Sequence, residues 1–465
     1  MNQKPQYNSI YALLLKNHLV VAICLFIDAY LIRFAFLLSS DNFYGPEPML
    51  NITTALHILT KPAFLQNIFY QQLPLFLYSL AGAVKLGSEQ IVSARFFIAA
   101  ASSLSLIPYY YLVKKIFNSK IALLSGVLLY SYYQHIIMSV VTMPEVIAIG
   151  FLFLCLWMVF EQKYLLGAVF CLIACGYSYL AWLTAPGIII YILLKQEKSL
   201  KQKLLNSFLF LAISCIFPLF WNFLVDKQYG PGWLWYKNFH EADSLYTFLF
   251  LVGKTMRQIL AGLFLKPESR IFFLGLIGIF SAVKKRKDLG YLLCVISIVF
   301  LLSLNVFRKE ILILEQGSLF VAALLIPYLV RGLIAGLKAL NLKRKIYALL
   351  ATVIICLLSL QAGFFQRPEV PVLVKEASFW LQKNASADSL IYIQKQAAGF
   401  HSFIAMESGL PQLNFCYLPK EFADIEPKNK QQYLVLPLSS EMNIDFEKWD
   451  KIKTLKGYLI FQRIK

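Results

Sequence analysis

The chain has 465 residues, of which 59% are hydrophobic and only 15% are charged, and its mean hydropathy is +0.63. A soluble globular protein usually has about a quarter of its residues charged, so this composition excludes an ordinary soluble domain. The formal net charge of +19 would suit a nucleic-acid-binding protein. The basic residues, however, gather in short gaps between apolar runs, as in "VKKIFNSK" and "VKKRKD". That pattern is typical of cytoplasmic loops and argues against nucleic acid as a partner.

The apolar runs predict an α-helical polytopic membrane protein with about eleven transmembrane helices. A helix that crosses the bilayer needs about 20 apolar residues, and several runs reach or approach that length. The predicted spans cover residues 18–38, 93–113, 121–140, 145–160, 164–181, 185–195, 204–225, 271–283, 289–306, 312–331 and 346–364. With the N-terminus inside, this order places the basic gaps in the cytoplasm and most acidic gaps outside.

The first outer segment, residues 39–92, contains two further helical stretches. They are "LNITTALHILTK" (50–61) and "YQQLPLFLYSLAGAVKL" (70–86), and both are only partly apolar. We expect them to be interfacial helices rather than spans.

The composition changes near residue 365, which divides the chain into a transmembrane domain (1–364) and a small soluble α/β domain (365–465). "VLVKEASFWLQKN" predicts an amphipathic helix, and "DSLIYIQ", "QYLVLPL" and "GYLIFQ" predict short strands. Because the number of spans is odd, the C-terminal domain is expected outside the membrane.

Two charged residues and two histidines interrupt the apolar segments. Asp28 and Arg33 lie inside the first span, where charged side chains usually face the protein interior. Their spacing of five residues does not suit an ion pair, so Arg33 is a candidate to face the outer site. His57 and His135 stand alone in the sequence and are expected to be packed or interfacial.

Two glutamates follow prolines at the edges of apolar runs, Glu47 in "DNFYGPEPML" and Glu145 in "TMPEVIAIGF". Taken singly, each is consistent with an ordinary helix start, and Thr142 to Glu145 matches a capping box. Taken together, they lie on the same outer face in the predicted topology, next to the interfacial helices. A dry environment raises the basicity of a carboxylate, which can then serve as a general base.

The order of these motifs resembles the C superfamily (GT-C) of membrane glycosyltransferases, and within it the protein O-mannosyltransferase and lipid A aminoarabinose transferase branch. Glu47 stands where the family has an acidic pair, and Glu145 stands where a second acid opens the fourth span. Pro74 and Tyr78 match a proline-rich segment with one proline lost, and Arg95 matches an Ala-Arg that begins the second span. The resemblance has this motif-level detail over residues 20–160.

The resemblance implies an inverting hexosyl- or pentosyltransferase that uses a polyprenyl-phosphate sugar donor and a lipid, glycan or protein acceptor. The phosphate is already a good leaving group, so the site needs a base and cations. Glu47 is the candidate base, and Glu145 would orient the acceptor or a divalent metal. No cofactor is certain, a divalent metal is possible, and its ligands are unknown. The candidate phosphate partners are Arg95, Arg257, Arg270, Arg308 and Lys309, for which the alternative is snorkelling to the headgroups.

These features predict an integral protein of the bacterial inner membrane that acts in cell-envelope glycosylation, with its C-terminal domain periplasmic or extracellular. Two other classes stay open. A transporter or lipid flippase should show matched repeats with broken helices, and none is visible. A catalytically inactive relative that acts as a membrane scaffold would fit the lone Glu47. A glycosidase also uses two acids, but a membrane-embedded site does not suit it.

Overall fold

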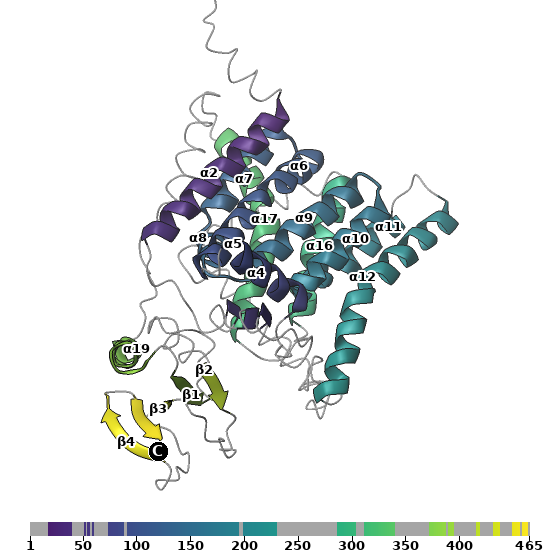
Figure 1. Cartoon of the computed structure of the whole chain (residues 1–465). Helices are drawn as coiled ribbons and strands as arrows, with labels where there is room; N and C mark the ends of the chain where they lie inside the picture. The colour runs from purple at the N-terminus through teal and green to yellow at the C-terminus, as the bar shows by residue number, and fades with distance from the viewer. Residues whose placement is uncertain are drawn as a thin grey trace, which may run out of the picture.

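The structure is a computed structural model in which most of the described chain is helical, with a small sheet near the C-terminus (Figure 1). The residues it describes are 17–39, 51–52, 54–55, 58–59, 73–87, 91–194, 199–229, 286–303, 311–339, 372–386, 389–394, 415–418, 431–437, 449–455 and 458–463. The helices of the apolar part form a bundle. The C-terminal unit lies beyond the end of the bundle at which α2 (His18–Ser39) ends.

The described part of the bundle contains most of the segments expected to be apolar helices. After α2 they are α4 (Pro74–Leu86), α5 (Ile91–Leu104), α6 (Leu106–Ile116), α7 (Ser119–Ser131), α8 (Tyr133–Val140), α9 (Glu145–Phe160), α10 (Tyr164–Tyr177), the 3-10 helix η1 (Tyr179–Thr184), α11 (Ala185–Leu194), α12 (Leu200–Tyr229), α16 (Arg286–Ser303) and α17 (Ile311–Ala339).

Among the described residues, three helical stretches are long and apolar enough to cross a membrane. They are His18–Leu38, Val92–Ile116 and Leu200–Leu224, and the bent pair of α7 and α8 would make a fourth. Two of the predicted spans, 271–283 and 346–364, lie outside the described residues. The count of eleven spans therefore stays a prediction.

The second predicted span, 93–113, is interrupted between α5 and α6. Pro108 has no amide hydrogen, and its ring crowds the carbonyl of Leu104, which favours a break or kink of the helix at this point. Ser105 lies at the break, and its hydroxyl donates to the carbonyl of Ser102 at 2.5 Å. The two helices still make one apolar stretch from Val92 to Ile116.

The third predicted span, 121–140, bends by 58° between α7 and α8. Tyr132 lies at the break in an extended conformation, with φ −65° and ψ 118°. The hydroxyl of Ser131 donates to the carbonyl of Val127 at 2.6 Å, which satisfies a backbone group at the end of α7. The bend turns α8 out of the direction of α7, and α8 then leads directly into the start of α9.

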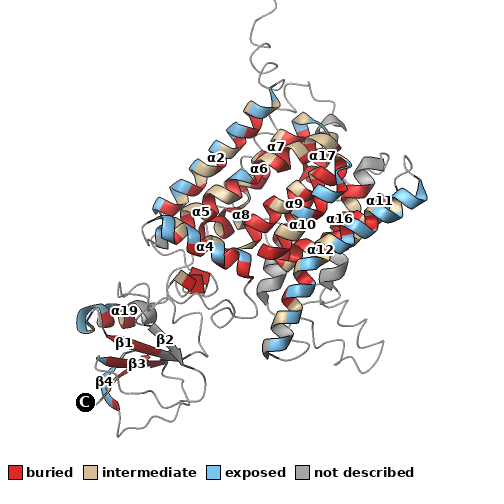
Figure 2. Ribbon diagram, turned by 45° about the vertical axis from the view of Figure 1, so that its right-hand side comes forward, coloured by how far each residue is buried: buried red, intermediate tan, exposed pale blue. Residues whose placement is uncertain are grey.

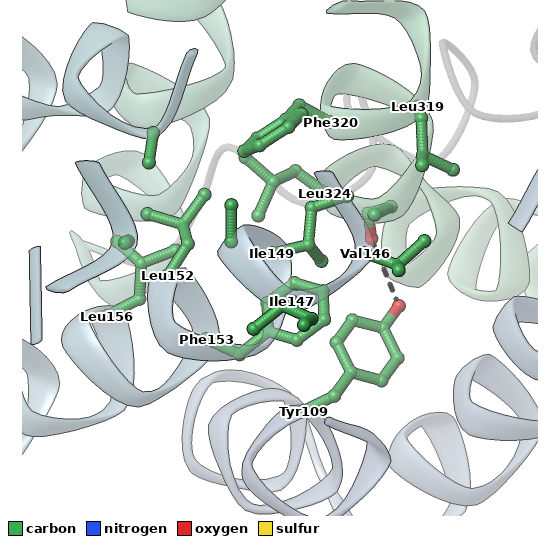
Figure 3. Close-up of a cluster of buried hydrophobic side chains, with 14 of the residues drawn as sticks. Tyr109, Val146, Ile147, Ile149, Leu152, Phe153, Leu156, Leu319, Phe320 and Leu324 are labelled. Carbon is green, nitrogen blue, oxygen red and sulfur yellow. Dashed lines mark hydrogen bonds between the residues drawn. The ribbon is translucent and has the colours of Figure 1, made fainter. Parts of the chain in front are cut away.

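The core of the bundle is built around α9, whose residues are buried on almost every side (Figure 2). A helix that is apolar all round is buried rather than amphipathic. The ring of Phe153 lies 4.7 Å from that of Tyr109 on α6, measured between centroids. The Tyr109 hydroxyl in turn donates to the carbonyl of Ala323 on α17 at 3.2 Å (Figure 3). Tyr109 of α6 thus contacts both α9 and α17.

The C-terminal unit contains α19 (Val372–Asn384) and a five-stranded mixed sheet. Its strands are β1 (Leu390–Gln394), β2 (Phe415–Leu418), β3 (Gln432–Pro437), β4 (Trp449–Thr454) and β5 (Tyr458–Arg463). They are ordered β2-β1-β3-β5-β4, with β1 parallel to β2 and β3, and with β5 antiparallel to β3 and β4. The predicted helix and the three predicted strands occur as α19, β1, β3 and β5. The domain boundary near 365 falls outside the described residues.

Candidate functional site at the corner between α8 and α9

Glu145 opens α9 and is only 3% exposed. The capping box predicted from Thr142 to Glu145 is wrong, because the N-cap residue is Pro144 and the cap has no side-chain hydrogen bond. Pro144 already has helical backbone angles, φ −69° and ψ −26°, and its carbonyl accepts from the amides of Ile147 and Ala148. Glu145 therefore lies closer to the helix start than the third position, which a capping box requires. A carboxylate at this position is favoured by the helix dipole.

Two buried arginines from other helices hold α8. Arg33 on α2 is fully buried, and its guanidinium lies 2.5 Å from Nδ1 of His135, in the first turn of α8. Its other terminal nitrogen donates to the carbonyl of Ala29 at 2.9 Å. Arg95 on α5 is 3% exposed, and its Nε donates to the carbonyl of Val140, the last residue of α8, at 3.0 Å. One cation is thus placed at each end of α8.

The turn from α8 to α9 is held by a residue of the first outer segment. Asn51 is buried, and its side-chain amide donates to the carbonyl of Thr142 at 3.3 Å. Thr142 and Met143 are buried as well. Residues that are far apart in the sequence, Asn51, Arg95 and Glu145, therefore share one buried polar corner. Such groups are expensive in an apolar bundle and usually mark a functional site.

Pro74 and Tyr78 lie on α4, which packs against α5 and α10. Pro74 is buried at the first helical position, whereas Tyr78 is 37% exposed. The hydroxyl of Ser79 lies 2.9 Å from that of Tyr177 on α10. A Cβ on Gly176 would lie 2.8 Å from a methyl group of Leu75, so Gly176 leaves room for this side chain where α4 packs against α10.

The other predicted site residues lie outside the described residues: Glu47, Arg257, Arg270, Arg308 and Lys309. Their roles stay predictions. In the part of the chain that the structure describes, no group of three or more His, Cys, Asp and Glu side chains is arranged to hold a metal ion.

One placement differs from what the sequence indicates. Asp28 is exposed, so the expectation that both charges of the first span face the interior is wrong. Residues five apart on an α-helix are about 140° apart around its axis, so Asp28 and Arg33 cannot both point inward. His135 is fully buried, as expected for a packed side chain, and it contacts Arg33. Arg33 and His135 are both polar residues in otherwise apolar segments, and polar residues within a membrane tend to pair with one another.

The sequence and the fold of the chain are similar to those of known proteins. A sequence model of the dolichyl-phosphate-mannose-protein mannosyltransferase family matches residues 71–221. A search of curated proteins gives no match. Among solved structures, the chain is similar to ArnT from Cupriavidus metallidurans in the apo state, with a TM-score of 0.59 and 12% identity. That match covers 95% of this chain and 98% of ArnT.

Two further structures extend the comparison. ArnT from the same organism bound to undecaprenyl phosphate matches with a TM-score of 0.59, 11% identity and the same coverage. The oligosaccharyltransferase of Archaeoglobus fulgidus, in complex with Zn and sulfate, matches with a TM-score of 0.52 and 13% identity, over 83% of this chain and 61% of that one. These matches confirm the resemblance predicted from the sequence: the chain has the fold of a polytopic membrane glycosyltransferase of the C superfamily.

Proposed function

We propose that the protein is an inverting glycosyltransferase that moves a sugar from a polyprenyl-phosphate donor to an acceptor hydroxyl at the outer face of the membrane. The observation that supports this most directly is the buried polar corner between α8 and α9, in a fold shared with ArnT. There Glu145 follows a turn whose backbone is held by Arg95 and Asn51. A corner that served only for packing would not need these buried polar groups.

In the proposed reaction, the acceptor oxygen attacks the anomeric carbon of the sugar from the side opposite the phosphate. The carbon–oxygen bond to the phosphate breaks, and the polyprenyl phosphate leaves with the bonding electron pair. The acceptor proton passes to the carboxylate of Glu47, which acts as general base. A single displacement of this kind inverts the anomeric configuration.

Cations would stabilise the negative charge on the departing phosphate. Arg95 is the one of the five candidate phosphate partners that the structure describes, and its contact with Val140 fixes the position of its guanidinium. Arginine suits this task because its planar group can donate two parallel hydrogen bonds to a phosphate. We assign the same task to Arg257, Arg270, Arg308 and Lys309.

Glu145 is assigned an orienting role, toward either the acceptor or a divalent metal. Its place at the start of α9 gives it a fixed direction and a favourable dipole. Glu145→Gln should therefore reduce transfer less than the loss of the general base. Tyr78, on the exposed side of α4, is assigned to the wall of the site.

The donor class has support from the structural neighbours. One ArnT structure is bound to undecaprenyl phosphate, and the archaeal oligosaccharyltransferase AglB is in complex with dolichol-phosphate and an inhibitory peptide. By analogy, we propose a polyprenyl phosphate carrying a hexose or a pentose, with a lipid, glycan or protein acceptor. The proposed location is the bacterial inner membrane, with the C-terminal unit on the periplasmic or extracellular side.

The test uses the purified protein in liposomes with radiolabelled undecaprenyl-phosphate hexose and pentose donors and an extract of cell-envelope acceptors. We expect acceptor-dependent release of undecaprenyl phosphate and an inverted anomeric configuration in the product. Movement of the intact lipid-linked sugar between leaflets without cleavage would contradict the proposal and indicate a flippase. No cleavage and no movement with any donor would indicate an inactive relative.

A further inference from the structure

Asp28 lies at the middle of the first candidate span. It is ten residues from each end of the 21-residue stretch His18–Leu38. With a rise of 1.5 Å per residue, this places its backbone about 15 Å from either end. The hydrocarbon core of a bilayer is about 30 Å thick, so Asp28 lies near the midplane.

The side chain of Asp28 points out of the bundle. It is exposed, and within the described part of the chain it makes no hydrogen bond or ion pair. Arg33, the cation closest in sequence, is fully buried and contacts Ala29 and His135 instead. The opposite side of α2 is occupied by packing inside the bundle, through residues such as Leu25 and Ala29.

The neighbours of Asp28 form a continuous exposed face. We define the Asp28 face as the exposed residues Cys24, Ile27, Asp28, Leu31 and Ala35, which lie on one side of α2. Figure 2 shows exposed segments along the outer side of this helix. The small side chains of Cys24 and Ala35 lie on either side of Asp28, one and two turns away. Small residues let two helices approach closely within a membrane.

A carboxylate facing lipid at this depth is unfavourable. Insertion measurements assign about 2.5–3.5 kcal/mol to a charged residue such as aspartate at the centre of a membrane helix. Headgroups are too far away to neutralise it, because they lie about 15 Å from the midplane. A basic side chain at the same depth would neutralise the charge and supply hydrogen-bond donors.

We propose that the Asp28 face binds a transmembrane helix of a partner protein that carries a lysine or arginine near the bilayer midplane. Charge complementarity selects this partner over a second copy of the chain. In a symmetric pair, Asp28 would face another Asp28, and two like charges in a low dielectric repel. Exposed faces such as that of Phe208 and Leu219 on α12 are purely apolar, as expected for contact with lipid.

The test uses the full chain, with a fluorescent donor protein fused at its N-terminus, reconstituted in liposomes. The probe is a synthetic Leu/Ala transmembrane helix with one central lysine and an acceptor dye, and its control has alanine in place of the lysine. We expect saturable energy transfer to the lysine helix at about tenfold lower mole fraction than to the alanine helix, equivalent to about 1.4 kcal/mol.

The matched variants are Asp28→Asn, which keeps the shape and removes the charge, and Asp28→Glu, which keeps the charge. The first should abolish the preference for lysine and the second should retain it. Equal binding of both probes to the wild type, or an unchanged preference in Asp28→Asn, would overturn the proposal. So would self-association of the chain that depends on Asp28. Sugar transfer by Asp28→Asn should be unchanged, so this test is independent of the proposed catalytic function.

Discussion

The guanidinium of Arg33, on α2, lies 2.5 Å from Nδ1 of His135, on α8, and both side chains are fully buried. The contact joins the first span to the short helix that leads into Glu145. A buried guanidinium without an acceptor is strongly unfavourable, so the imidazole fixes where α8 lies relative to α2.

The first prediction concerns this pair. His135→Leu leaves the buried guanidinium without its side-chain acceptor and should lower the free energy of unfolding by about 1.5–3 kcal/mol. The double variant Arg33→Met with His135→Leu removes the charge together with its acceptor, so it should be more stable than His135→Leu alone. Chemical unfolding in detergent of the wild type, both single variants and the double variant measures the coupling. Additive effects of the two substitutions would contradict the contact.

The second prediction concerns close packing of α11 against α16. A Cβ on Gly187 would lie 2.6 Å from the carbonyl oxygen of Leu293 and 2.8 Å from Cα of Cys294, which are backbone atoms. Gly187→Ala should therefore destabilise the protein by about 1–3 kcal/mol, as overpacking does. Gly82→Ala on α4 is the matched control, because a Cβ there has no atom within 4 Å. Equal melting temperatures of the two variants in detergent would disprove this.

The third prediction concerns topology. The odd number of expected spans and the basic inner gaps place Asn384, at the end of α19, on the opposite side of the membrane from Ser199, at the start of α12. Reporter fusions after each residue, one active only outside and one only inside the cell, should give opposite signals. The same compartment for both residues would overturn the predicted topology.

The fourth prediction concerns alkaline pH in the C-terminal unit. Burial raises the pKa of Tyr433 above its ordinary value of 10.0, and its hydroxyl donates to the carbonyl of Asn384 at 3.0 Å. The folded unit holds this proton more tightly than the unfolded chain. The contribution of Tyr433 to its stability should therefore be constant below pH 10 and fall as the pH rises above it.

Limited proteolysis that releases a C-terminal tag can be used to measure this loss of stability below and above pH 10. Tyr433→Phe removes both the titrating group and the hydrogen bond, so its release should be faster than wild type below pH 10 and rise less above it. An identical pH profile for both proteins would show that Tyr433 does not contribute.

Much of the helical architecture could be predicted from the sequence. The sequence predicts the first span at 18–38, which occurs as α2, and the fourth at 145–160, which occurs as α9. Long apolar runs bounded by charged residues or prolines have well-defined ends. The break at Ser105 has a visible cause in Pro108, whereas the break at Tyr132 has no glycine or proline beside it. Beyond that break, a tertiary contact between Arg33 and His135 positions α8.

The candidate site was predictable in part. Glu145 and Arg95 were expected at the starts of their helices, and they occur there. Arg95 contacts the backbone of α8 rather than reaching toward solvent, and Asn51 was not expected at the site at all. Both depend on the position of the α8 backbone, which no local pattern specifies. Residue types alone predict a capping box, which is wrong because the N-cap residue is Pro144 rather than Thr142.

The central claim is that a carboxylate in the first outer segment removes the acceptor proton. Glu47→Gln keeps the shape of the side chain but cannot accept that proton, so transfer should fall by about 100- to 10,000-fold. At the helix start predicted for Glu47, loss of its charge would change the free energy of unfolding by only about 0.3–1 kcal/mol, so the variant should still fold. Asp41→Asn is the control, because it removes another carboxylate from the same segment.

The decisive measurement is the rate of undecaprenyl-phosphate release by wild type, Glu47→Gln and Asp41→Asn in liposomes, alongside binding of the lipid-linked donor. Glu47→Gln should bind the donor normally and transfer almost no sugar, while Asp41→Asn should retain most of its transfer rate. Near wild-type release by Glu47→Gln, or a loss of activity that follows only from misfolding, would contradict the role of Glu47 as general base.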